Sequence, residues 1–515
     1  MSPPVETEIK FEIPSSDVAS LNKLAPLRRA ETVRPAKQVS IYFDTKKFAL
    51  RKNGVLFRVR RTGRHYVQTI KSAGSGLLDR NEWENELKSG KPDFGAARHT
   101  ALEPLLTKKL RRKLRPVFET RVRRTTYPLR ASQIEVTVDR GEIGTGDRTK
   151  PLCEIEIESK SGGRDALFRL ARTIARSTSA ELAMKSKAQR GYELLDGNDS
   201  SATKADPIVL KADTKSRDAF YQIAVSCLKQ VVVNKRALLA GNPEGVHQMR
   251  IGLRRLRAAI SLFSDLLETS EANAIKSQLK WLTEELGPAR EFEVFLARVV
   301  APARRHHSRL IGMQRLSHDL ADQRRASIER ARDAIRSERF RRLLLNVATW
   351  LEIGNWRHPR ADLLGQRGDT PIVVSAAAAL GRRSKKIRKK SRQLTKLDQR
   401  GRHKLRIRAK KLRYATEFFE TVFADKKASK RRKAFLGALE GMQDCLGDLN
   451  DIAVHETLTE DMATNPTPHT RAKDRSRRAF AAGVLTGHEE ARVNAVLADA
   501  VAACETFSKA KPFWK

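Results

Sequence analysis

Glutamates spaced two residues apart recur in several short segments of this sequence, and two of these segments start the argument. Glu6 and Glu8 are followed by Lys10 in a run of alternating polar and apolar residues, and a second run holds Glu154, Glu156 and Glu158. Alternate residues of a β-strand share one face. Carboxylates on one face repel each other unless a cation lies between them, and clusters of carboxylate oxygens suit Mg²⁺ or Mn²⁺. The spacing therefore predicts a divalent-metal site.

Basic side chains follow the same spacing in other runs. They are Arg58 and Arg60 in one run, Arg121 and Arg123 in a second, and Lys71 at the end of a third. Guanidinium groups bind phosphate oxygens in a bidentate way. A closed sheet whose charged side chains point inward would bring these bases and the acids into one interior. For any single strand, a charged face in solvent is the alternative.

The hydrophobic period changes once along the chain. Residues 1–200 alternate at period two, which indicates strands, and residues beyond about 210 follow a period of 3.6, which indicates helices. The polar segment 201–209 between them predicts a linker. We expect an α+β protein of two domains: an N-terminal antiparallel β-barrel with flanking helices over 1–200, and an all-α domain over 210–510.

The helical half contains an internal repeat, around 246–296 and again around 402–456. Residues 246–257 and 402–413 share His, Arg, Ile, Leu and Arg at matching positions. This repeat predicts two related helical bundles. On a helical wheel each copy places its basic residues on one arc, opposite an apolar face. These residues are His247, Arg250, Arg254 and Arg257 in the first copy, and His403, Arg406, Lys410 and Arg413 in the second.

These basic arcs carry no acid of their own, although ordinary solvated faces mix both signs to gain favourable pairs. The arcs therefore predict anion binding, with a half-buried hydrogen-bonding role as the alternative for His247 and His403. The net charge of +42, from 102 Lys and Arg against 60 Asp and Glu, points to a polyanionic partner. Aromatic residues form only 6% of the chain and do not interleave the basic helices, which argues against nucleic-acid stacking.

The remaining composition predicts a cytoplasmic protein. Four well-separated cysteines without a CxxC pair indicate reduced thiols. No basic and apolar leader stands at the start of the sequence. The best apolar run, 372–380, is far shorter than the roughly 18 residues of a membrane span.

At Glu6-Thr-Glu8-Ile-Lys10 the sequence resembles the CYTH, or triphosphate tunnel metalloenzyme, family with its ExExK motif. Further similar segments follow in the family's order. They are Tyr42-Phe-Asp44-Thr45, Leu56-Phe-Arg58-Val-Arg60, Lys71, Arg80-Asn-Glu82-Trp-Glu84, Arg121-Val-Arg123, Asp139-Arg-Gly141, the acidic run from Glu154 (with Ser159 where Leu is usual), and Ser186-Lys187-Ala-Gln-Arg190-Gly191-Tyr192.

The resemblance implies hydrolysis of a short phosphate chain such as inorganic triphosphate. It implies that Glu6, Glu8, Glu154, Glu156 and Glu158 hold Mg²⁺ or Mn²⁺, with Glu6, Glu8 and Lys10 as catalytic residues. It also implies that phosphoryl oxygens are bound by Lys10, Arg58, Arg60, Lys71, Arg121, Arg123, Lys187 and Arg190. Asp139 is equally well explained as a turn residue before Gly141, and Glu82 and Glu84 as a solvated face.

The repeated His-x-x-Arg pattern resembles the CHAD family, which is helical, often follows CYTH domains and is associated with inorganic polyphosphate. The first copy departs from the family, which usually has Arg-Asp-x-Asp where this chain has Arg290-Glu291-Phe-Glu293. The second copy keeps Asp448 and Asp451 but has Asn450 where the family has Arg. The resemblance implies a triphosphatase whose second domain binds polyphosphate, with association with polyphosphate granules as a further expectation. Two alternatives stay open: a non-catalytic granule protein, and an enzyme acting on a nucleoside or thiamine triphosphate.

Overall fold

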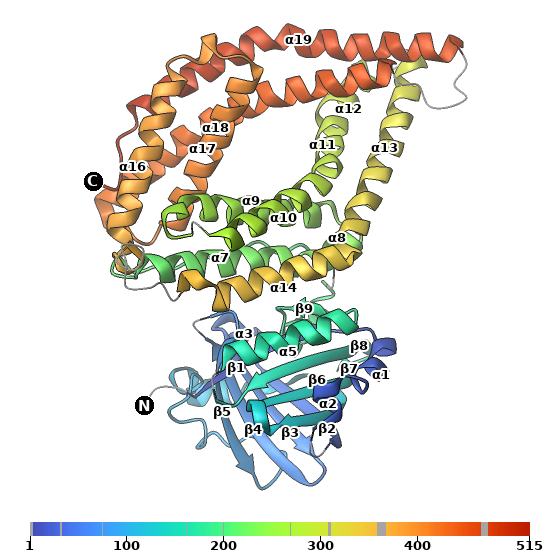
Figure 1. Cartoon of the computed structure of the whole chain (residues 1–515), viewed down its shortest axis with the longest axis vertical. Coiled ribbons are helices and arrows are strands. Elements are labelled where there is room, and N and C mark those ends of the chain that lie inside the picture. Colours follow the sequence, from blue (N-terminus) through green and yellow to red (C-terminus); the bar gives the residue numbers. More distant parts are fainter. Residues whose placement is uncertain are drawn as a thin grey trace. The chain divides into compact units, whose positions relative to one another are not determined.

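The computed structural model describes residues 4–30, 33–74, 76–161, 163–198, 200–267, 269–306, 311–357, 367–464 and 472–515 (Figure 1). The chain forms two compact units. The first unit comprises Met1–Lys204, Leu228–Met249 and Ile335–Arg357. The second unit comprises Ala205–Cys227, Arg250–Ala334 and His358–Lys515.

A closed antiparallel barrel dominates the first unit. Within the described residues, eight strands follow one another around it in the order β5-β4-β3-β2-β6-β7-β8-β1, and β5 pairs with β1 to close the circle. The strands are β1 (Val5–Glu12), β2 (Arg34–Asp44), β3 (Val55–Thr62), β4 (His65–Ala73), β5 (Asp79–Leu87), β6 (Arg115–Leu129), β7 (Ile134–Thr145) and β8 (Arg148–Ser159). The predicted fold, a barrel followed by a helical region, is confirmed.

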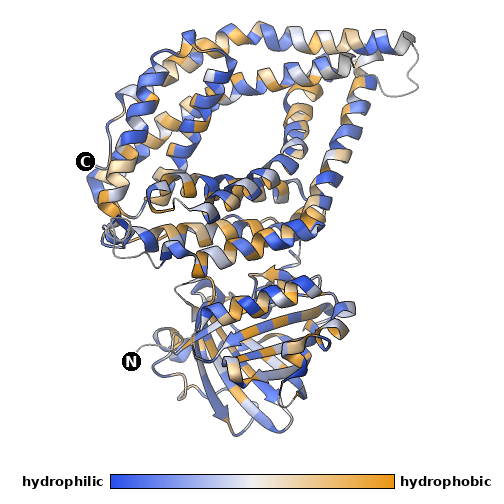
Figure 2. Ribbon diagram, viewed as in Figure 1, coloured by the Kyte–Doolittle hydropathy of each residue, from blue (hydrophilic) through white to orange (hydrophobic). Residues whose placement is uncertain are grey.

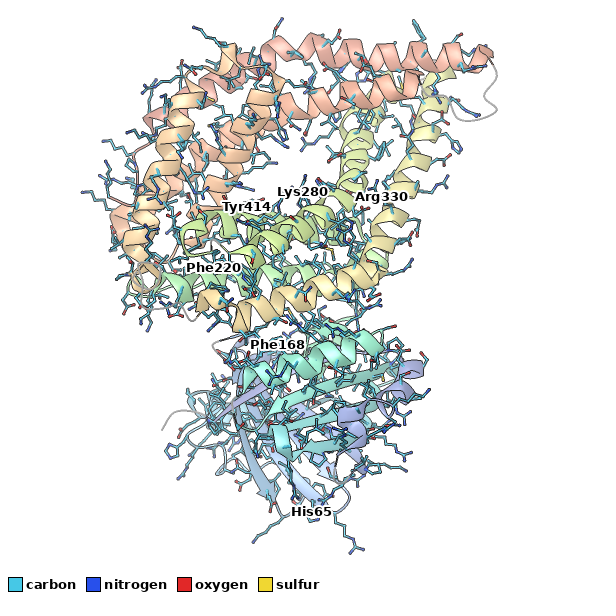
Figure 3. The ribbon with its side chains drawn as sticks, in the orientation of Figure 1. His65, Phe168, Phe220, Lys280, Arg330 and Tyr414 are labelled. Atoms are coloured by element: carbon cyan, nitrogen blue, oxygen red, sulfur yellow. The ribbon has the colours of Figure 1, made fainter. Side chains whose placement is uncertain are left out.

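Strand β1 closes the barrel with two different partners on one edge. Its first residues pair with β5, where Glu6 lies opposite Arg80, and its last residues pair with the short β9 (Glu181–Ala183), where Glu12 lies opposite Glu181. Alternation along β1 sends Ile9 and Phe11 outward into a buried apolar layer. The helix α5 (Arg164–Ser177) contributes Phe168 to that side of the sheet (Figure 3) and contacts β8.

One end of the barrel is filled by α6 (Lys187–Asp196). Ser186 and Gln189 form a capping box at its start, which satisfies the first N–H groups of the helix. Its Ala188 and Tyr192 pack among inward-facing apolar residues, namely Tyr42, Phe118, Val122, Ile143 and Leu152. Gly191 lies so close to the ring of Phe118 that an added Cβ would stand 2.3 Å from it. This packing directs Lys187 and Arg190 to the barrel interior.

A buried carboxylate holds α6 to the end of β2. Asp44 accepts the backbone N–H groups of Thr45 at 2.7 Å, Leu50 at 2.9 Å and Arg51 at 3.0 Å. It also accepts the hydroxyl of Tyr192 at 2.7 Å, and this arrangement raises the pKa of Tyr192, through burial first and the charge of Asp44 next. The YFDT segment is therefore a structural anchor for the helix that closes the barrel.

Helical segments also belong to the first unit. They include α8 (Lys235–Leu239) and α14 (Glu338–Ile353). Lys235 forms an ion pair with Glu181 of β9, and buried Glu352 forms one with Arg164 at the start of α5. Arg164 also binds Asp79 of β5 at 2.8 Å. These ion pairs join the helical segments to the strands around β1.

The second unit is helical throughout its described elements. Its long helices are α10 (Ser270–Glu285), α16 (Ile372–Ser391), α17 (Gln399–Phe418), α18 (Lys426–Thr464) and α19 (Ala472–Lys509), and the shorter α11 (Gly287–Phe295) follows α10. Three helices span the boundary between the units: α7 (Ser216–Val233), α9 (Pro243–Leu262) and, by its last two residues, α13 (Ile311–Arg336). Hydrophobic and hydrophilic residues alternate along these helices (Figure 2). The equivalent phenylalanines of the two repeats, Phe263 and Phe419, meet edge to face at 6.3 Å.

The apolar composition of the helices and the state of the cysteines can be described for this structure. None of the described helices combines the length and apolar composition that crossing a membrane requires. Cys153, Cys227, Cys445 and Cys504 are free cysteines in the described structure.

Candidate functional site

The barrel interior collects the predicted acids from two neighbouring strands. In the β1–β8 register, Glu8 lies opposite Glu158, Lys10 opposite Glu156, and Glu12 opposite Glu154. Because the Cα partners of an antiparallel pair point to the same side, both acidic runs face inward together. The two motifs, far apart in sequence, therefore form one charged surface.

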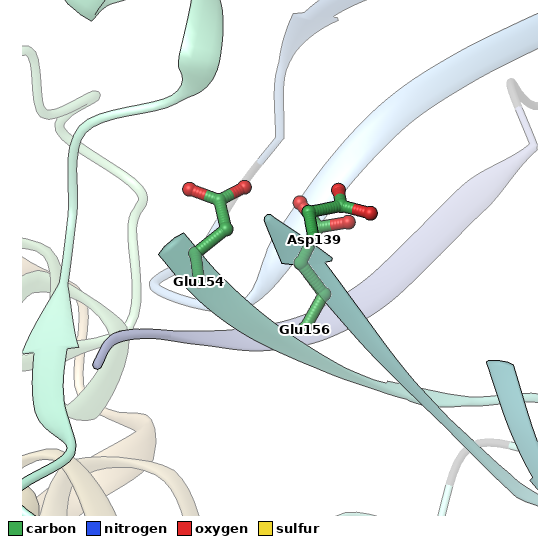
Figure 4. Close-up of side chains that lie close together, drawn as sticks. All are labelled: Asp139, Glu154 and Glu156. Carbon is green, nitrogen blue, oxygen red and sulfur yellow. The ribbon is translucent and has the colours of Figure 1, made fainter. Parts of the chain in front are cut away.

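Three carboxylates form the densest acidic group among the described residues. Asp139 of β7 lies directly opposite Glu154 of β8, and Glu156 follows on the same face. Oxygen atoms of the three carboxylates lie within 4.8 Å of one another (Figure 4). Asp139 and Glu154 are each only 1% exposed. Buried carboxylate oxygens at this spacing are suitable ligands for a hard divalent cation such as Mg²⁺ or Mn²⁺.

Neighbouring cations keep Asp139 and Glu156 ionised. Burial alone would raise the pKa of Asp139, but Lys187 and Arg124 outweigh it and lower that pKa to about 2. Burial is likewise outweighed at Glu156, where Lys10, Lys187 and Arg124 hold the pKa well below its usual range. Both groups therefore carry their charge at neutral pH and are available as ligands.

The bases around this acidic group come from three elements. Lys10 of β1 lies 2.6 Å from Glu156 and 2.8 Å from Glu8. Lys187 of α6 lies 2.8 Å from Asp139 and 3.1 Å from Glu156, and it also pairs with Glu154. Arg190, which is only 2% exposed, also pairs with Glu154.

Arg124 of β6 supplies the fourth base of this group. It binds both oxygens of Asp139 at 2.7 Å and reaches Glu156 at 2.8 Å. Although burial lowers its pKa, Asp139 and Glu156 raise it by more, so the guanidinium stays charged. This bidentate geometry matches the way a guanidinium binds a phosphoryl group.

A second group of ion pairs joins β1 to strands β3, β4 and β5. Lys71 lies 2.6 Å from Glu6 and 2.9 Å from Glu82. Arg60 lies 3.0 Å from Glu84, and Arg80 reaches Glu8 at 3.1 Å. Both Glu82 and Glu84 thus pair with bases of this group, Glu82 from a half-buried position and Glu84 from an exposed one.

Two arginines of β3 crowd each other in this group. The pKa of Arg60 is lowered to about 10, first by repulsion from Arg58 and second by burial. The buried Tyr42 hydroxyl faces the same cations. Burial would raise its pKa, but Arg58 and Lys187 lower it below the ordinary value. Excess positive charge on this side favours an anion.

Glu158 occupies a more exposed position, with 26% of its side chain accessible and Lys160 at 2.7 Å. Its pKa is raised, by burial first and by the nearby charges of Glu6 and Glu135. The crowding of acids around Glu158 is the situation that a bound cation relieves.

Two predicted residues do not lie in the interior. Arg121 and Arg123 are exposed on the outer side of β6, where Arg121 pairs with Glu119 and, at 3.4 Å, with Glu142. The buried residues Phe118, Thr120 and Val122 show that the even-numbered positions of β6 face inward, and Arg124 shares their face. The prediction that Arg121 and Arg123 reach the interior is therefore wrong for this strand, and Arg124 takes their place.

The remaining predicted residues of the barrel do come together. They are Glu6, Glu8, Lys10, Arg58, Arg60, Lys71, Glu154, Glu156, Glu158, Lys187 and Arg190, joined by Asp139. Asp139 is a ligand candidate within a strand and not a turn residue, since β7 runs through it.

The basic arcs of the two repeats also converge within the second unit. Arg250 and Arg254 lie on α9, and Arg406 and Lys410 lie on α17, all half-buried. The pKa of Lys410 is lowered to about 7, first by burial and next by repulsion from Arg406 and Arg254. Burial and Arg254 likewise lower the pKa of Arg250 to about 10.

These arginines retain hydrogen-bond donors without acceptors. Nε and Nη1 of Arg250, Nε of Arg254 and Nε of Arg406 are buried and lack a partner among the described atoms. Buried donors are normally satisfied, so their grouping indicates a site for an anion. We name Arg250, Arg254, Arg406 and Lys410 the helical cation cluster.

Each repeat places one acid and one glycine beside this cluster. Glu291 lies 3.9 Å from Arg250, and Asp451 lies 3.6 Å from Arg406. Gly287 and Gly447 stand under the same two guanidinium groups. Glu291 therefore keeps the position of Asp451 despite the sequence departure, while Glu293 binds Arg290 at 2.7 Å.

The other predicted residues of the arcs lie near the cluster with varied partners. The ring nitrogen Nδ1 of His403 lies 2.5 Å from Oδ1 of Asn450, which favours an orienting role for this exposed histidine. Arg413 lies 3.6 Å from Glu417. His247 and Arg257 are half-buried on α9.

With this geometry established, comparisons place both regions in known families. Residues 5–192 match the model of the CYTH domain, and residues 222–460 match that of the CHAD domain. The chain therefore combines a CYTH domain with a CHAD domain.

Individual relatives agree with this assignment. An inorganic triphosphatase of Haemophilus influenzae is 32% identical over 160 residues, which are 30% of this chain and 44% of the relative. The chain thus spans less than half of that relative. The CHAD domain structure from Ricinus communis is similar to 59% of this chain and 96% of its own, with 26% identity and a TM-score of 0.50.

The placement of Arg124 predicts a contrast in stability. Arg124→Leu removes a cation that balances the charge of buried Asp139, so it should lower the free energy of unfolding by about 3 kcal/mol. Arg121→Leu removes an exposed pair and should change it by at most about 0.5 kcal/mol. Urea denaturation of both variants checks this, and equal losses would contradict the inward placement of Arg124.

Proposed function

We propose that the barrel hydrolyses inorganic triphosphate with a divalent metal ion, and that the helical cation cluster binds inorganic polyphosphate. The observation that carries the first part is the buried group of Asp139, Glu154 and Glu156 with its surrounding cations. A metal and a phosphate chain are the two ligands that such an interior suits together.

The metal would be held by carboxylates alone. Glu6, Glu8, Glu154, Glu156 and Glu158 are the proposed ligands, and the structure adds Asp139. Their donor atoms are oxygen only, and Asp139 and Glu156 are ionised at neutral pH, which fits Mg²⁺ or Mn²⁺. Such a metal polarises a phosphoryl group and lowers the pKa of a bound water.

The bases would bind and orient the phosphate chain. Each base now pairs with a carboxylate, so substrate binding exchanges a carboxylate for a phosphoryl oxygen at the same nitrogen atom. In the transition state these cations stabilise charge on the equatorial oxygens. The proposed set is Lys10, Arg58, Arg60, Lys71, Arg124, Lys187 and Arg190.

The catalytic assignment predicts that Glu8→Gln lowers phosphate release by at least about a hundredfold, because a buried ligand and partner of Lys10 loses its charge. Phosphate release would be measured from inorganic triphosphate, ATP and long-chain polyphosphate, each with Mg²⁺, Mn²⁺ or chelator. We expect hydrolysis of triphosphate with metal only.

Glu142→Gln is the matched control, because it removes a carboxylate from the outer side of β7 and should leave turnover unchanged. Preference for ATP would point to a nucleoside triphosphatase. Absence of release from every substrate would contradict the enzymatic proposal and support a granule-binding protein.

Polyphosphate binding by the second unit rests on the unsatisfied donors of Arg250, Arg254 and Arg406. A polyanion would supply acceptors to all three and relieve the repulsion that lowers the pKa of Lys410. Bound phosphate would therefore raise that pKa, and binding above about pH 7 would take up a proton.

We predict that polyphosphate affinity falls as pH rises from about 7 to about 9, by up to about tenfold per pH unit, because Lys410 must be protonated in the complex. Lys410→Arg should remove most of this pH dependence, while Lys404→Ala, an exposed lysine on the same helix, should retain it. Calorimetry with long-chain polyphosphate at fixed ionic strength measures both, and an unchanged pH profile in Lys410→Arg would argue against the cluster.

A further inference from the structure

A chain of ion pairs leads from α8 to the acidic group of the barrel. Nη2 of Arg236 lies 2.7 Å from Oε2 of Glu12, the last residue of β1. The other oxygen of Glu12, Oε1, lies 3.5 Å from Nη1 of Arg190. Arg190 in turn pairs with Glu154. All four residues lie in the first compact unit, and Arg236 lies within the residues that match the CHAD domain.

Arg190 stands between two competing carboxylates. It is 2% exposed, and its Nε is buried without a hydrogen-bond partner among the described atoms. Glu154 draws it to the interior, and Glu12 draws it to the end of β1. A guanidinium shared in this way settles on the carboxylate whose charge is less compensated.

Arg236 changes the outcome of that competition, because it neutralises Glu12 from the far side. The Arg236 contact is the shorter of the two that Glu12 makes, 2.7 Å against 3.5 Å for Arg190. Burial would raise the pKa of Glu12, but Arg236 first and Arg190 second lower it, so Glu12 stays charged at neutral pH. A charged Glu12 without Arg236 would have Arg190 as its closest cation.

We propose that Arg236 is a positioning residue for the phosphate site of the barrel: it neutralises Glu12 and so keeps Arg190 on the interior side, beside Glu154, where phosphate would bind. The inference rests on the proposed triphosphate site. It assigns a role to Arg236, a residue that lies outside the sequence motifs of the barrel. A residue of the helical sequence would then set the substrate affinity of the barrel.

The test measures binding of inorganic triphosphate to the full-length protein by calorimetry in chelator, alongside KM and kcat with Mn²⁺. Arg236→Gln should weaken triphosphate binding and raise KM about fivefold, with a smaller change in kcat, because Arg190 shifts to Glu12. The double variant Glu12→Gln/Arg236→Gln should restore the wild-type values, since Glu12 no longer competes for Arg190.

Lys235→Gln is the matched control, because Lys235 lies on the same helix, α8, as Arg236 but pairs with Glu181 of β9. It should bind triphosphate like the wild type. The proposal would be overturned if Arg236→Gln lost affinity for triphosphate and the double variant did not restore it. It would also be overturned if Arg236→Gln bound triphosphate as tightly as the wild type. Wild-type protein that binds triphosphate without hydrolysing it would contradict the proposed enzymatic function and leave this binding test decisive.

Discussion

The barrel interior is governed by the cost of burying charge. A buried ion without a partner costs several kcal/mol, so acids and bases within a closed sheet must balance locally. Each interior glutamate accordingly meets a cation from another strand or from α6, as Glu6 meets Lys71 and Glu156 meets Lys10. These pairs fix the register of β1 against its neighbours and require α6 to close the barrel with Lys187 and Arg190. In the proposed function these pairs would be exchanged, with a metal in place of the cations and phosphate in place of the acids.

The second unit meets the same constraint only in part. Around the helical cation cluster, Glu291 and Asp451 lie 3.9 and 3.6 Å from their arginines, at the outer range of ion pairing. Several guanidinium donors of the cluster lack an acceptor within the described part of the chain. Burial first, and repulsion among the neighbouring cations next, lowers the pKa values of Arg250, Arg406 and Lys410. A balanced interior suits a metal with a short phosphate chain and therefore chemistry, whereas an unbalanced cluster suits an anion alone.

Local alternation was enough to predict the barrel, the two acidic strands and the basic arcs, because burial imposes period two on strands and 3.6 on helices. It failed at β6, where Arg121, Arg123 and Arg124 occupy both faces and only the buried Phe118 and Val122 reveal which one is inside. The role of Asp139 depended on its cross-strand partner Glu154, and that of Arg236 on a contact with Glu12 across more than two hundred positions. Such long-range pairings leave no periodic trace in a single sequence.

The central claim is that metal and phosphate chain release each other's binding groups within one interior. Calorimetry can test it by titrating Mn²⁺ and a non-hydrolysable triphosphate analogue into the protein, each alone and each in the presence of the other. Because the metal takes acids that now pair with the phosphate-binding bases, the account predicts that each ligand binds at least about tenfold more tightly when the other is present. Equal affinities in the two conditions would contradict a shared interior of exchangeable ion pairs.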